Sequence, residues 1–425
     1  MLADDLGYAD VGCYGARTRV TPAIDALARS GLRFTDGYAN SPVCSPTRFA
    51  LLTGSYQYRF RGGVEEPISA ARQKNPAMAL PPGTPTLPAR LRAAGYATAL
   101  IGKWHLGRPP HCGPLQHGYE EFFGPLGGSV DYFSYVNRSG IRDLYDGDRE
   151  VEAQGYLTDL LSERAVGFVR RQAQSRRPFL LSLQYTAPHW PWQTRESAAS
   201  SPRSLTHTDG GSIATYYRMI EQMDEGIGRV IQALRDGALL DNTLVVFTSD
   251  NGGERFSDMW PFIGQKMDLL EGGIRVPLIA SWPTRIPAGS TTAEMAITMD
   301  WVATFLDAAG IAPERGHLLD GISLLPVVEG RGTVGARDLY WRMHYRRQAA
   351  VRSGRWKFLR IGEHEYLFDL AADPRERANL AQRHPQRLAD LRQRFAAWEV
   401  SMPAIPGDAQ FHLAYTERDL PRGWG

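Results

Sequence analysis

The sequence contains little cysteine and little lysine. Cysteine occurs only at Cys13, Cys44 and Cys112 in a chain of 425 residues, and this small odd count argues against a disulfide framework and leaves at least one thiol free. We interpret Cys13 and Cys112 as structural. Among 48 basic residues, lysine is confined to Lys74, Lys103, Lys266 and Lys357. In such an arginine-rich chain, a retained lysine marks a position where a compact ammonium group is needed.

Strong net charge and long apolar runs are also missing. The 48 basic and 46 acidic residues leave a formal charge of +2, with no polybasic run, so no nucleic-acid partner is expected. No apolar run approaches the ~18 residues of a membrane span, so no transmembrane segment is expected. A hydrophobic content of 43% is that of a globular protein, and a small anionic substrate remains open.

The segment ahead of the first acidic pair is short. Met1–Ala3 is too short for a signal peptide, although a strand should lead into Asp4 and Asp5. We therefore expect a truncated start and the loss of any targeting segment. The compartment stays open, with a periplasmic, other extracytoplasmic or lysosome-like location among the alternatives.

Apolar runs rich in β-branched residues alternate with longer amphipathic segments. This pattern predicts an α/β fold with a mainly parallel sheet flanked by helices. The expected strands cover residues 96–101, 178–185, 244–248 and 276–281. The expected helices cover residues 21–29, 86–94, 156–174 and 212–236, several beginning after Thr or Ser and ending before Gly.

The pattern of predicted elements changes near residue 335. Residues 339–346, 348–361 and 365–369 are predicted as strands, and an arginine-rich helix follows through Trp398. Closely spaced strands of this kind favour a small antiparallel sheet. We therefore predict two domains, a catalytic domain over residues 1–335 and a C-terminal α+β subdomain over residues 336–425.

Polar and titratable residues repeatedly follow the predicted strands directly. One acidic pair in such a place is usually a solvated turn, but four endings in one chain favour a functional site. In an open α/β sheet, residues at the carboxyl ends of strands meet in one crevice. The residues in question are Asp4, Asp5, Lys103, His105, His189, Asp250 and Asn251.

The oxygen-bearing members of this set suit a hard metal ion. Asp4, Asp5, Asp250 and Asn251 offer carboxylate and amide oxygens without a thiolate pair or a histidine pair at metal spacing. This donor set favours Ca²⁺, with Mg²⁺ second, over zinc. The alternative interpretation is that residues 250–253, Asp-Asn-Gly-Gly, form only a β-turn.

The segment Cys44-Ser45-Pro46-Thr47-Arg48 is predicted to begin a helix, since proline is tolerated in a first turn. Cys44 would then lie at the positive end of the helix dipole, where anions are favoured. Arg48, one turn further on, adds a guanidinium that binds tetrahedral oxyanions with two hydrogen bonds. These residues alone allow either a reactive thiolate or a buried, inert cysteine.

Taken together, these motifs resemble the sulfatase family. Cys44-Ser45-Pro46-Thr47-Arg48 followed by residues 51–54, Leu-Leu-Thr-Gly, is similar to its Cys-X-Pro-X-Arg signature. The ordered match continues through residues 3–8, 102–107, 187–189, 249–253, 265–266 and 271–277. Residues 352–357 and 367–374 are similar to the C-terminal subdomain of arylsulfatase-like members.

The resemblance implies an alkaline-phosphatase-like fold and a sulfuric ester hydrolase. It implies that a formylglycine-generating enzyme oxidises Cys44 to formylglycine. It also implies a calcium site built from Asp4, Asp5, Asp250, Asn251 and the modified residue 44. The partner would be a small sulfated substrate, namely an aryl sulfate, a sulfated sugar or a sulfolipid.

The resemblance also implies a role for each site residue. One hydroxyl of the hydrated aldehyde would attack sulfur after losing its proton to Asp250, while calcium, Arg48, Lys103 and Lys266 stabilise the sulfuryl charge. His189 or Lys266 would protonate or neutralise the departing oxygen of the leaving group. His105 would deprotonate the second hydroxyl, so that sulfate is eliminated and the aldehyde is restored.

Two rival functions remain. A phosphate or phosphonate monoester hydrolase of the same superfamily would use the same oxyanion site. A noncatalytic protein that binds sulfated glycans would retain the pocket without converting Cys44. The presence of four titratable residues, Lys103, His105, His189 and Lys266, disfavours the second rival, because binding alone does not need them.

Overall fold

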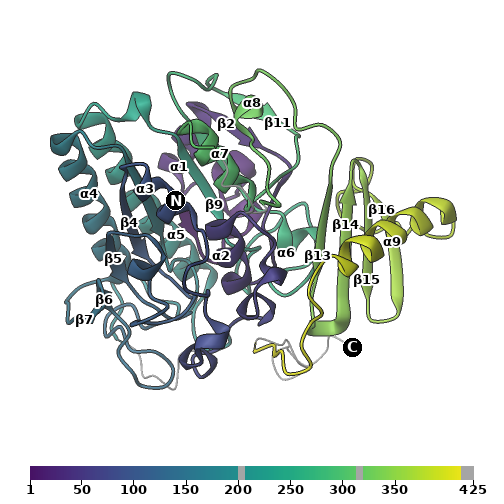
Figure 1. Ribbon diagram of the computed structural model, residues 1–425, viewed down its shortest axis with the longest axis horizontal. Helices are drawn as coiled ribbons and strands as arrows, with labels where there is room; N and C mark the ends of the chain where they lie inside the picture. The colour runs from purple at the N-terminus through teal and green to yellow at the C-terminus, as the bar shows by residue number, and fades with distance from the viewer. Residues whose placement is uncertain (200–205, 313–318, 413–425) are drawn as a thin grey trace.

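The computed structural model describes residues 1–199, 206–312 and 319–412. Its larger part is built on a ten-stranded sheet with the strand order β11-β2-β10-β9-β1-β8-β4-β5-β6-β7, seen in Figure 1. The five central parallel strands are β9 (Val245–Ser249), β1 (Leu2–Ala3), β8 (Phe179–Gln184), β4 (Ala97–Gly102) and β5 (Glu121–Gly124). The α/β prediction with a mainly parallel sheet is therefore confirmed.

The outer strands are more mixed in direction. β10 (Leu278–Ser281) runs antiparallel to β9, so the strand predicted at 276–281 exists but does not continue the parallel order. Beyond it lie β2 (Leu32–Phe34) and β11 (Ser290–Thr292), and at the other edge lie β6 (Tyr145–Asp146) and β7 (Arg149–Glu150). A separate pair joins β3 (Gly37–Tyr38) to β12 (Ala296–Ile297).

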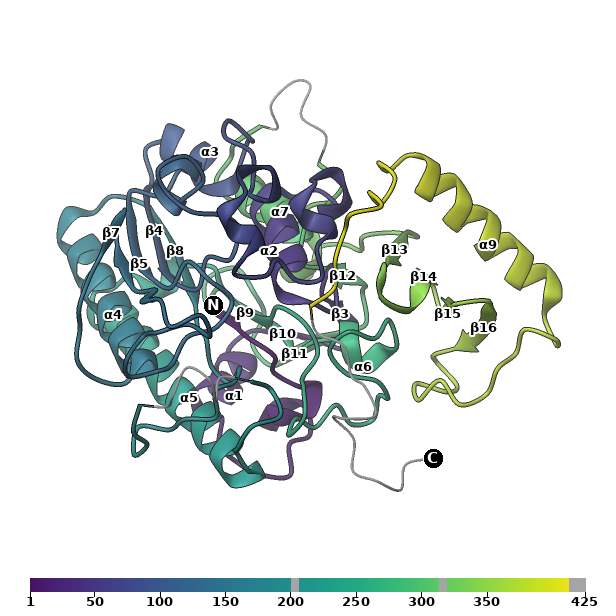
Figure 2. The ribbon, with the colours of Figure 1, turned by 90° about the horizontal axis from the view of Figure 1, so that it is seen from below.

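Helices cover both faces of this sheet (Figure 2). One face carries α1 (Pro22–Arg29), α4 (Leu157–Ser175) and α5 (Ile213–Asp236). The other carries α2 (Cys44–Thr53), α3 (Leu87–Ala93) and α7 (Asp300–Ala308). The four helices predicted from the sequence are present, and two begin as expected, because Thr86 and Ser212 accept hydrogen bonds from Ala89 and Thr215 as N-caps.

The C-terminal part contains a four-stranded antiparallel sheet and a helix. Its strands are β13 (Asp338–Arg342), β14 (Gln348–Ser353), β15 (Trp356–Ile361) and β16 (His364–Asp369), and its helix is α9 (Pro385–Val400). The single run predicted at 348–361 is in fact a hairpin, because Gly354 takes a left-handed φ of 54° between β14 and β15. The run predicted at 339–346 ends at Arg342.

This separate sheet agrees with the predicted C-terminal subdomain, while the boundary at residues 335/336 stays a prediction. Residues 413–425 of the predicted subdomain lie outside the described residues. The described residues also contain two short α-helices, α6 (Glu271–Ile274) and α8 (Leu325–Val328), and several single-turn 3-10 helices. Among the described helices, none is both long and apolar enough to cross a membrane.

Candidate active site

Four neighbouring strands deliver most of the predicted site residues. In the sheet order β9-β1-β8-β4, Asp250 and Asn251 follow β9, Asp4 and Asp5 follow β1, His189 follows β8, and Lys103 and His105 follow β4. Because these strands are parallel, all their carboxyl ends lie at one edge. Glycine is required where β4 ends, since a Cβ on Gly102 would lie 1.7 Å from the carbonyl oxygen of Gln184.

Cys44 is the first residue of α2, as predicted. Thr47 closes the turn before the helix, because its hydroxyl accepts from the backbone N–H of Ser41 and donates to the Ser41 carbonyl. Cys44 is 1% exposed. Burial raises the pKa of Cys44 despite the nearby charges of Lys103 and Lys266. The reactive-thiolate alternative is therefore not favoured by this environment.

Arg48 connects the cysteine helix to the acidic residues. Its Nη2 lies 3.1 Å from Oδ2 of Asp4 and 2.9 Å from Oδ2 of Asp250. Its Nη1 donates to the Lys103 carbonyl oxygen at 2.9 Å and to Oε1 of Gln184 at 2.7 Å. Together with the bond from Nε to Oδ2 of Asp250, these bonds use all five N–H groups and hold the guanidinium in a buried position beside the acidic residues.

The two lysines of the site each contact one carboxylate of the acidic pair. Nζ of Lys103 donates to Oδ2 of Asp4, and Nζ of Lys266 lies 2.6 Å from Oδ2 of Asp5. Burial alone would lower the pKa of Lys266, but the charges of Asp5 and Glu254 raise it above its ordinary value. Lys266 therefore carries a proton at neutral pH.

The contacts of His105 define its tautomer. Nε2 lies 2.8 Å from the carbonyl oxygen of Ile68, which can only accept, so Nε2 carries the hydrogen. Nδ1 therefore presents a lone pair, and it lies 3.5 Å from Sγ of Cys44. Burial, and next the charge of Lys103, hold the pKa of His105 well below its ordinary value. The ring is neutral and faces residue 44 as a base.

His189 has the opposite arrangement of its ring nitrogens. Nδ1 lies 2.6 Å from the carbonyl oxygen of Trp190 and donates to it. Nε2 is directed at the acidic pair, 3.6 Å from Oδ2 of Asp5. Burial, followed by the charges of Lys266 and Lys103, lowers the pKa of His189 strongly, so this ring is also neutral.

The oxygen atoms of the site fit a hard cation. Oδ1 of Asp4 and Oδ1 of Asn251 are buried and have no hydrogen-bond partner among the described residues. Ligand atoms of Asp4, Cys44 and Asp250 lie within 4.8 Å of one another, as do those of Asp4, Asp5 and His189. Burial and the charge of Asp4 raise the pKa of Asp250 to about 7. Crowded carboxylates with unpartnered oxygens favour a bound cation.

All of the predicted site residues therefore lie in one buried cluster. Sequence reasoning missed Gln184, which holds Arg48, and Glu254, whose Oε2 lies 4.0 Å from Nζ of Lys266. Gln184 had a detectable signal, because it is the polar residue at the end of the mainly apolar strand β8. Glu254 follows the Asp250 motif by a few residues and had no separate signal.

Comparison with known proteins identifies the family. Residues 1–311 match the sulfatase family model, and residues 263–398 match the model described as N-sulphoglucosamine sulphohydrolase, C-terminal. The chain is 35% identical to human N-acetylgalactosamine-6-sulfatase, over 78% of this chain and 65% of that protein. It is 34% identical to bovine arylsulfatase A, over 92% of this chain and 80% of that protein. The chain thus spans about two thirds of the length of the N-acetylgalactosamine-6-sulfatases that it matches.

Solved structures agree with this result. The structure of Ps i-CgsB superposes with a TM-score of 0.87 at 30% identity, covering 97% of this chain and 94% of that one. Phosphonate monoester hydrolase of Agrobacterium radiobacter shares the fold with a TM-score of 0.67 at 21% identity, covering 94% of each chain. The chain therefore belongs to the sulfatase family of enzymes, which hydrolyse sulfate esters within the alkaline-phosphatase-like superfamily.

Proposed function

We propose that the protein is a calcium-dependent sulfuric ester hydrolase of the arylsulfatase-like type, in which Cys44 is converted to formylglycine by a formylglycine-generating enzyme. One observation carries this proposal: residue 44 begins a buried helix and faces the free lone pair of His105 at 3.5 Å. Three side-chain cations, Arg48, Lys103 and Lys266, bond to Asp250, Asp4 and Asp5, and the charges of the two lysines act on residue 44. Formylglycine would supply, as its hydrate, a hydroxyl nucleophile and a second hydroxyl from which the aldehyde is restored.

The cations hold the charge of the transferring sulfuryl group. Arg48 is held in place by Asp4, Asp250 and Gln184, so its positive charge is already positioned when the substrate binds. Lys103 follows the end of β4, and Lys266 lies in the segment between β9 and α6, where each lysine bonds to one carboxylate of the acidic pair. Asp4, Asp5, Asp250 and Asn251 would hold Ca²⁺, which supplies further Lewis-acid stabilisation of the sulfate oxygens when bound.

The two proton transfers at residue 44 are made by one carboxylate, that of Asp250, and one histidine, His105. Asp250 takes the proton of the attacking hydroxyl at residue 44, to which its carboxylate is close. His105 takes the proton of the second hydroxyl through Nδ1, which the Ile68 carbonyl keeps unprotonated by binding Nε2–H. Release of inorganic sulfate then follows cleavage of the carbon–oxygen bond.

Two residues are candidates for the departing oxygen. Lys266 holds a proton at neutral pH and can donate it directly. His189 is neutral with Nε2 toward the cluster, so it must gain a proton before it donates one. The retained proton of Lys266 favours it as the donor, with His189 orienting the leaving group.

The test of this function is a comparison of matched esters. An aryl sulfate and the corresponding aryl phosphate are assayed on protein produced with a formylglycine-generating enzyme, with Cys44→Ala as the control for contaminating activity. The proposal predicts a higher kcat/KM for the sulfate and no turnover by Cys44→Ala. A higher kcat/KM for the phosphate would establish the phosphatase or phosphonate hydrolase alternative. Tight sulfate-ester binding without turnover by the converted protein would establish the noncatalytic alternative.

Among sulfated substrates, we propose a sulfated sugar over an aryl sulfate or a sulfolipid. Relatives named N-acetylgalactosamine-6-sulfatase match at 33–35% identity, and the related Ps i-CgsB was solved with a neocarrahexaose. Release of sulfate from sulfated monosaccharides, measured beside an aryl sulfate, tests this choice. Efficient hydrolysis of the aryl ester together with inert sulfated sugars would refute it.

A further inference from the structure

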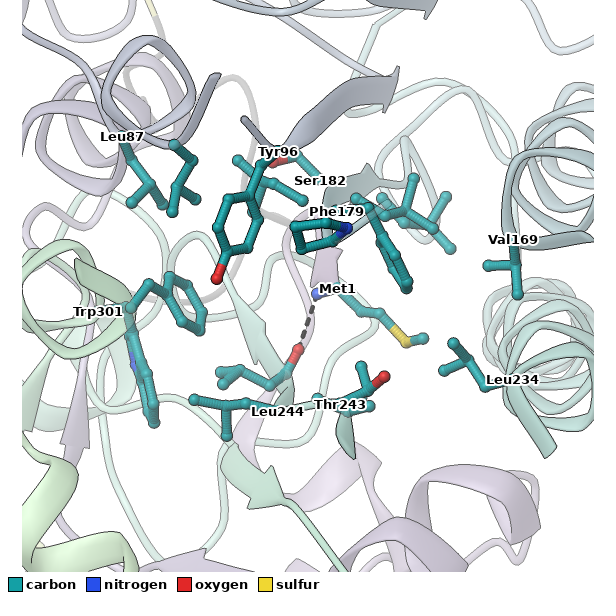
Figure 3. Close-up of a pocket in the computed structure, with 18 of the residues that line it drawn as sticks. Met1, Leu87, Tyr96, Val169, Phe179, Ser182, Leu234, Thr243, Leu244 and Trp301 are labelled. Atoms are coloured by element: carbon teal, nitrogen blue, oxygen red, sulfur yellow. Dashed lines mark hydrogen bonds between the residues drawn. The ribbon is translucent and has the colours of Figure 1, made fainter. Parts of the chain in front are cut away.

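Two features of the structure adjoin the active site. One is a cavity of about 790 Å³ between the helices of the two faces, with Met1 in its lining (Figure 3). Its lining also includes Arg48 and Gln184 of the active site, so the cavity belongs to the surroundings of that site and forms no second one. The other feature is the C-terminal sheet, which contacts the loop that carries Lys266.

The loop around Lys266 is held by backbone hydrogen bonds and contains a left-handed residue. The N–H of Lys266 donates to the Gly253 carbonyl at 2.9 Å, and the N–H of Met267 donates to the Pro42 carbonyl at 3.0 Å. Met267 has a φ of 76°, which costs free energy in a residue that carries a Cβ. Such a conformation persists only where the surrounding structure holds it.

Gln348 provides such a hold from the C-terminal sheet. It is the first residue of β14, and its side chain is buried. Its Nε2 donates to the carbonyl oxygen of Met267 at 2.8 Å, and its Oε1 accepts from the N–H of Leu269 at 2.9 Å. One side-chain amide therefore binds two successive peptide groups just after Lys266.

The amide of Gln348 is itself fixed in one orientation. Its Nε2 also donates to the carbonyl oxygen of Tyr345 at 3.2 Å. Because the nitrogen faces two carbonyls and the oxygen faces an N–H, only this assignment of the two atoms satisfies all three contacts. The turn before Gln348 is held by the buried carboxylate of Glu66, which accepts from the N–H groups of His344 and Tyr345.

Gln348 lies on the face of the C-terminal sheet that packs on the catalytic part. Side chains alternate along a strand, so Gln348 shares its face with Arg352, whose Nη2 lies 3.2 Å from Oδ2 of Asp36. Phe358 of β15 lies on the opposite face, where its ring centre is 6.3 Å from that of Phe395 in α9. Phe358 therefore offers a matched control, because it supports the same sheet from the other side.

We propose that Gln348 is a positioning residue for Lys266, which sets where the lysine ammonium lies relative to Asp5 and to the departing oxygen of the substrate. The inference rests on the proposed function for the step at the departing oxygen. Nζ of Lys266 lies 2.6 Å from Oδ2 of Asp5, a contact that a displaced loop would lengthen. A misplacement of about 1 Å in a reacting group can lower the rate on the order of 10²-fold.

The position of Lys266 can be measured by NMR of isotope-labelled lysine side chains, without any reaction. The chain has only four lysines, Lys74, Lys103, Lys266 and Lys357, and Lys266→Arg identifies the signal of that residue. In Gln348→Met, the Lys266 signal is expected to shift, whereas the signal of Lys357 on the same sheet stays in place. Phe358→Leu is the control and should leave both signals unchanged.

Turnover tests the consequence for the departing oxygen. An alkyl oxygen needs a proton or a positive charge to depart, whereas a nitrophenolate departs with little help. Gln348→Met should therefore lower kcat for an alkyl sulfate at least about tenfold more than for nitrophenyl sulfate. In the Lys266→Ala background, the same substitution should change kcat by less than about twofold, because it acts through the lysine.

Several outcomes would overturn the proposal. An unmoved Lys266 signal in Gln348→Met would show that the amide does not set the lysine's position. Equal shifts of the Lys266 and Lys357 signals, or equal losses of kcat on the two esters, would show a general displacement of the sheet instead.

A second variant covers the case in which Gln348→Met does not fold. Gln348→Glu keeps an acceptor for Leu269 and loses the amide donors, so the same shift of the Lys266 signal is expected, and its absence would overturn the proposal. Inactivity of the unaltered chain on every sulfate ester would contradict the proposed function alone, because the spectra require no turnover.

Discussion

Nδ1 of His105 lies 3.5 Å from Sγ of Cys44, with the ring held by the Ile68 carbonyl on its far side. The two residues are 61 positions apart in the sequence. They meet because Cys44 begins α2 and His105 follows the end of β4. The neutral ring therefore presents a base to residue 44.

This geometry predicts a specific defect in His105→Gln. The first half of the reaction should proceed, giving a burst of the alcohol or phenol product equal to the enzyme concentration. Steady-state turnover should then fall by roughly 10²–10⁴, the usual contribution of a general base. Rapid-mixing kinetics with an aryl sulfate measures both phases, and His364→Gln on the exposed end of β16 serves as the control. Loss of the burst itself would show that His105 acts earlier.

Removal of a predicted metal ligand should weaken calcium binding without unfolding the protein. Asn251→Ala deletes the amide whose Oδ1 has no partner among the described residues, so we expect the calcium Kd to rise by at least about tenfold. Calorimetric titration of chelator-treated protein measures this independently of activity. Asn242→Ala, an exposed amide, should leave the Kd unchanged, and equal effects of the two variants would contradict the predicted ligand set.

A buried lysine joins the C-terminal sheet to the catalytic part. Nζ of Lys357 in β15 lies 2.9 Å from Oε1 of Glu271 in α6 and 2.8 Å from Oε1 of Glu376. Lys357→Met leaves two buried carboxyl groups without their cation, which should lower the free energy of unfolding by about 3–5 kcal/mol. Denaturant titration beside exposed Lys74→Met is the measurement. A smaller loss in the double variant with Glu376→Gln is expected, and equal stability of the two single variants would refute the prediction.

The residues of the site were predicted more accurately than the strand directions and turns around it. Asp4, Lys103, His189 and Asp250 could be identified because each is a polar residue that directly follows an apolar run, a pattern visible in a short stretch of sequence. The sequence did not predict that β10 runs antiparallel or that residues 348–361 fold back at Gly354, since a short apolar run carries no direction.

Hydrogen bonds to backbone carbonyls could not be predicted from the sequence either. The tautomers of His105 and His189 depend on the carbonyls of Ile68 and Trp190. Any residue type supplies such an oxygen, so only the path of the loop decides the partner. Gln184 is different, because a polar residue at the end of β8 follows the same rule as the residues that were identified.

The central claim is that residue 44 becomes formylglycine, and mass spectrometry of the intact peptide across Cys44 tests it most directly. The protein should be produced together with a formylglycine-generating enzyme. We predict a peptide mass about 18 Da below that of the cysteine form, with a gain of one water on hydration. A peptide that keeps its thiol under these conditions, in protein that hydrolyses sulfate esters, would contradict every role assigned to the modified residue.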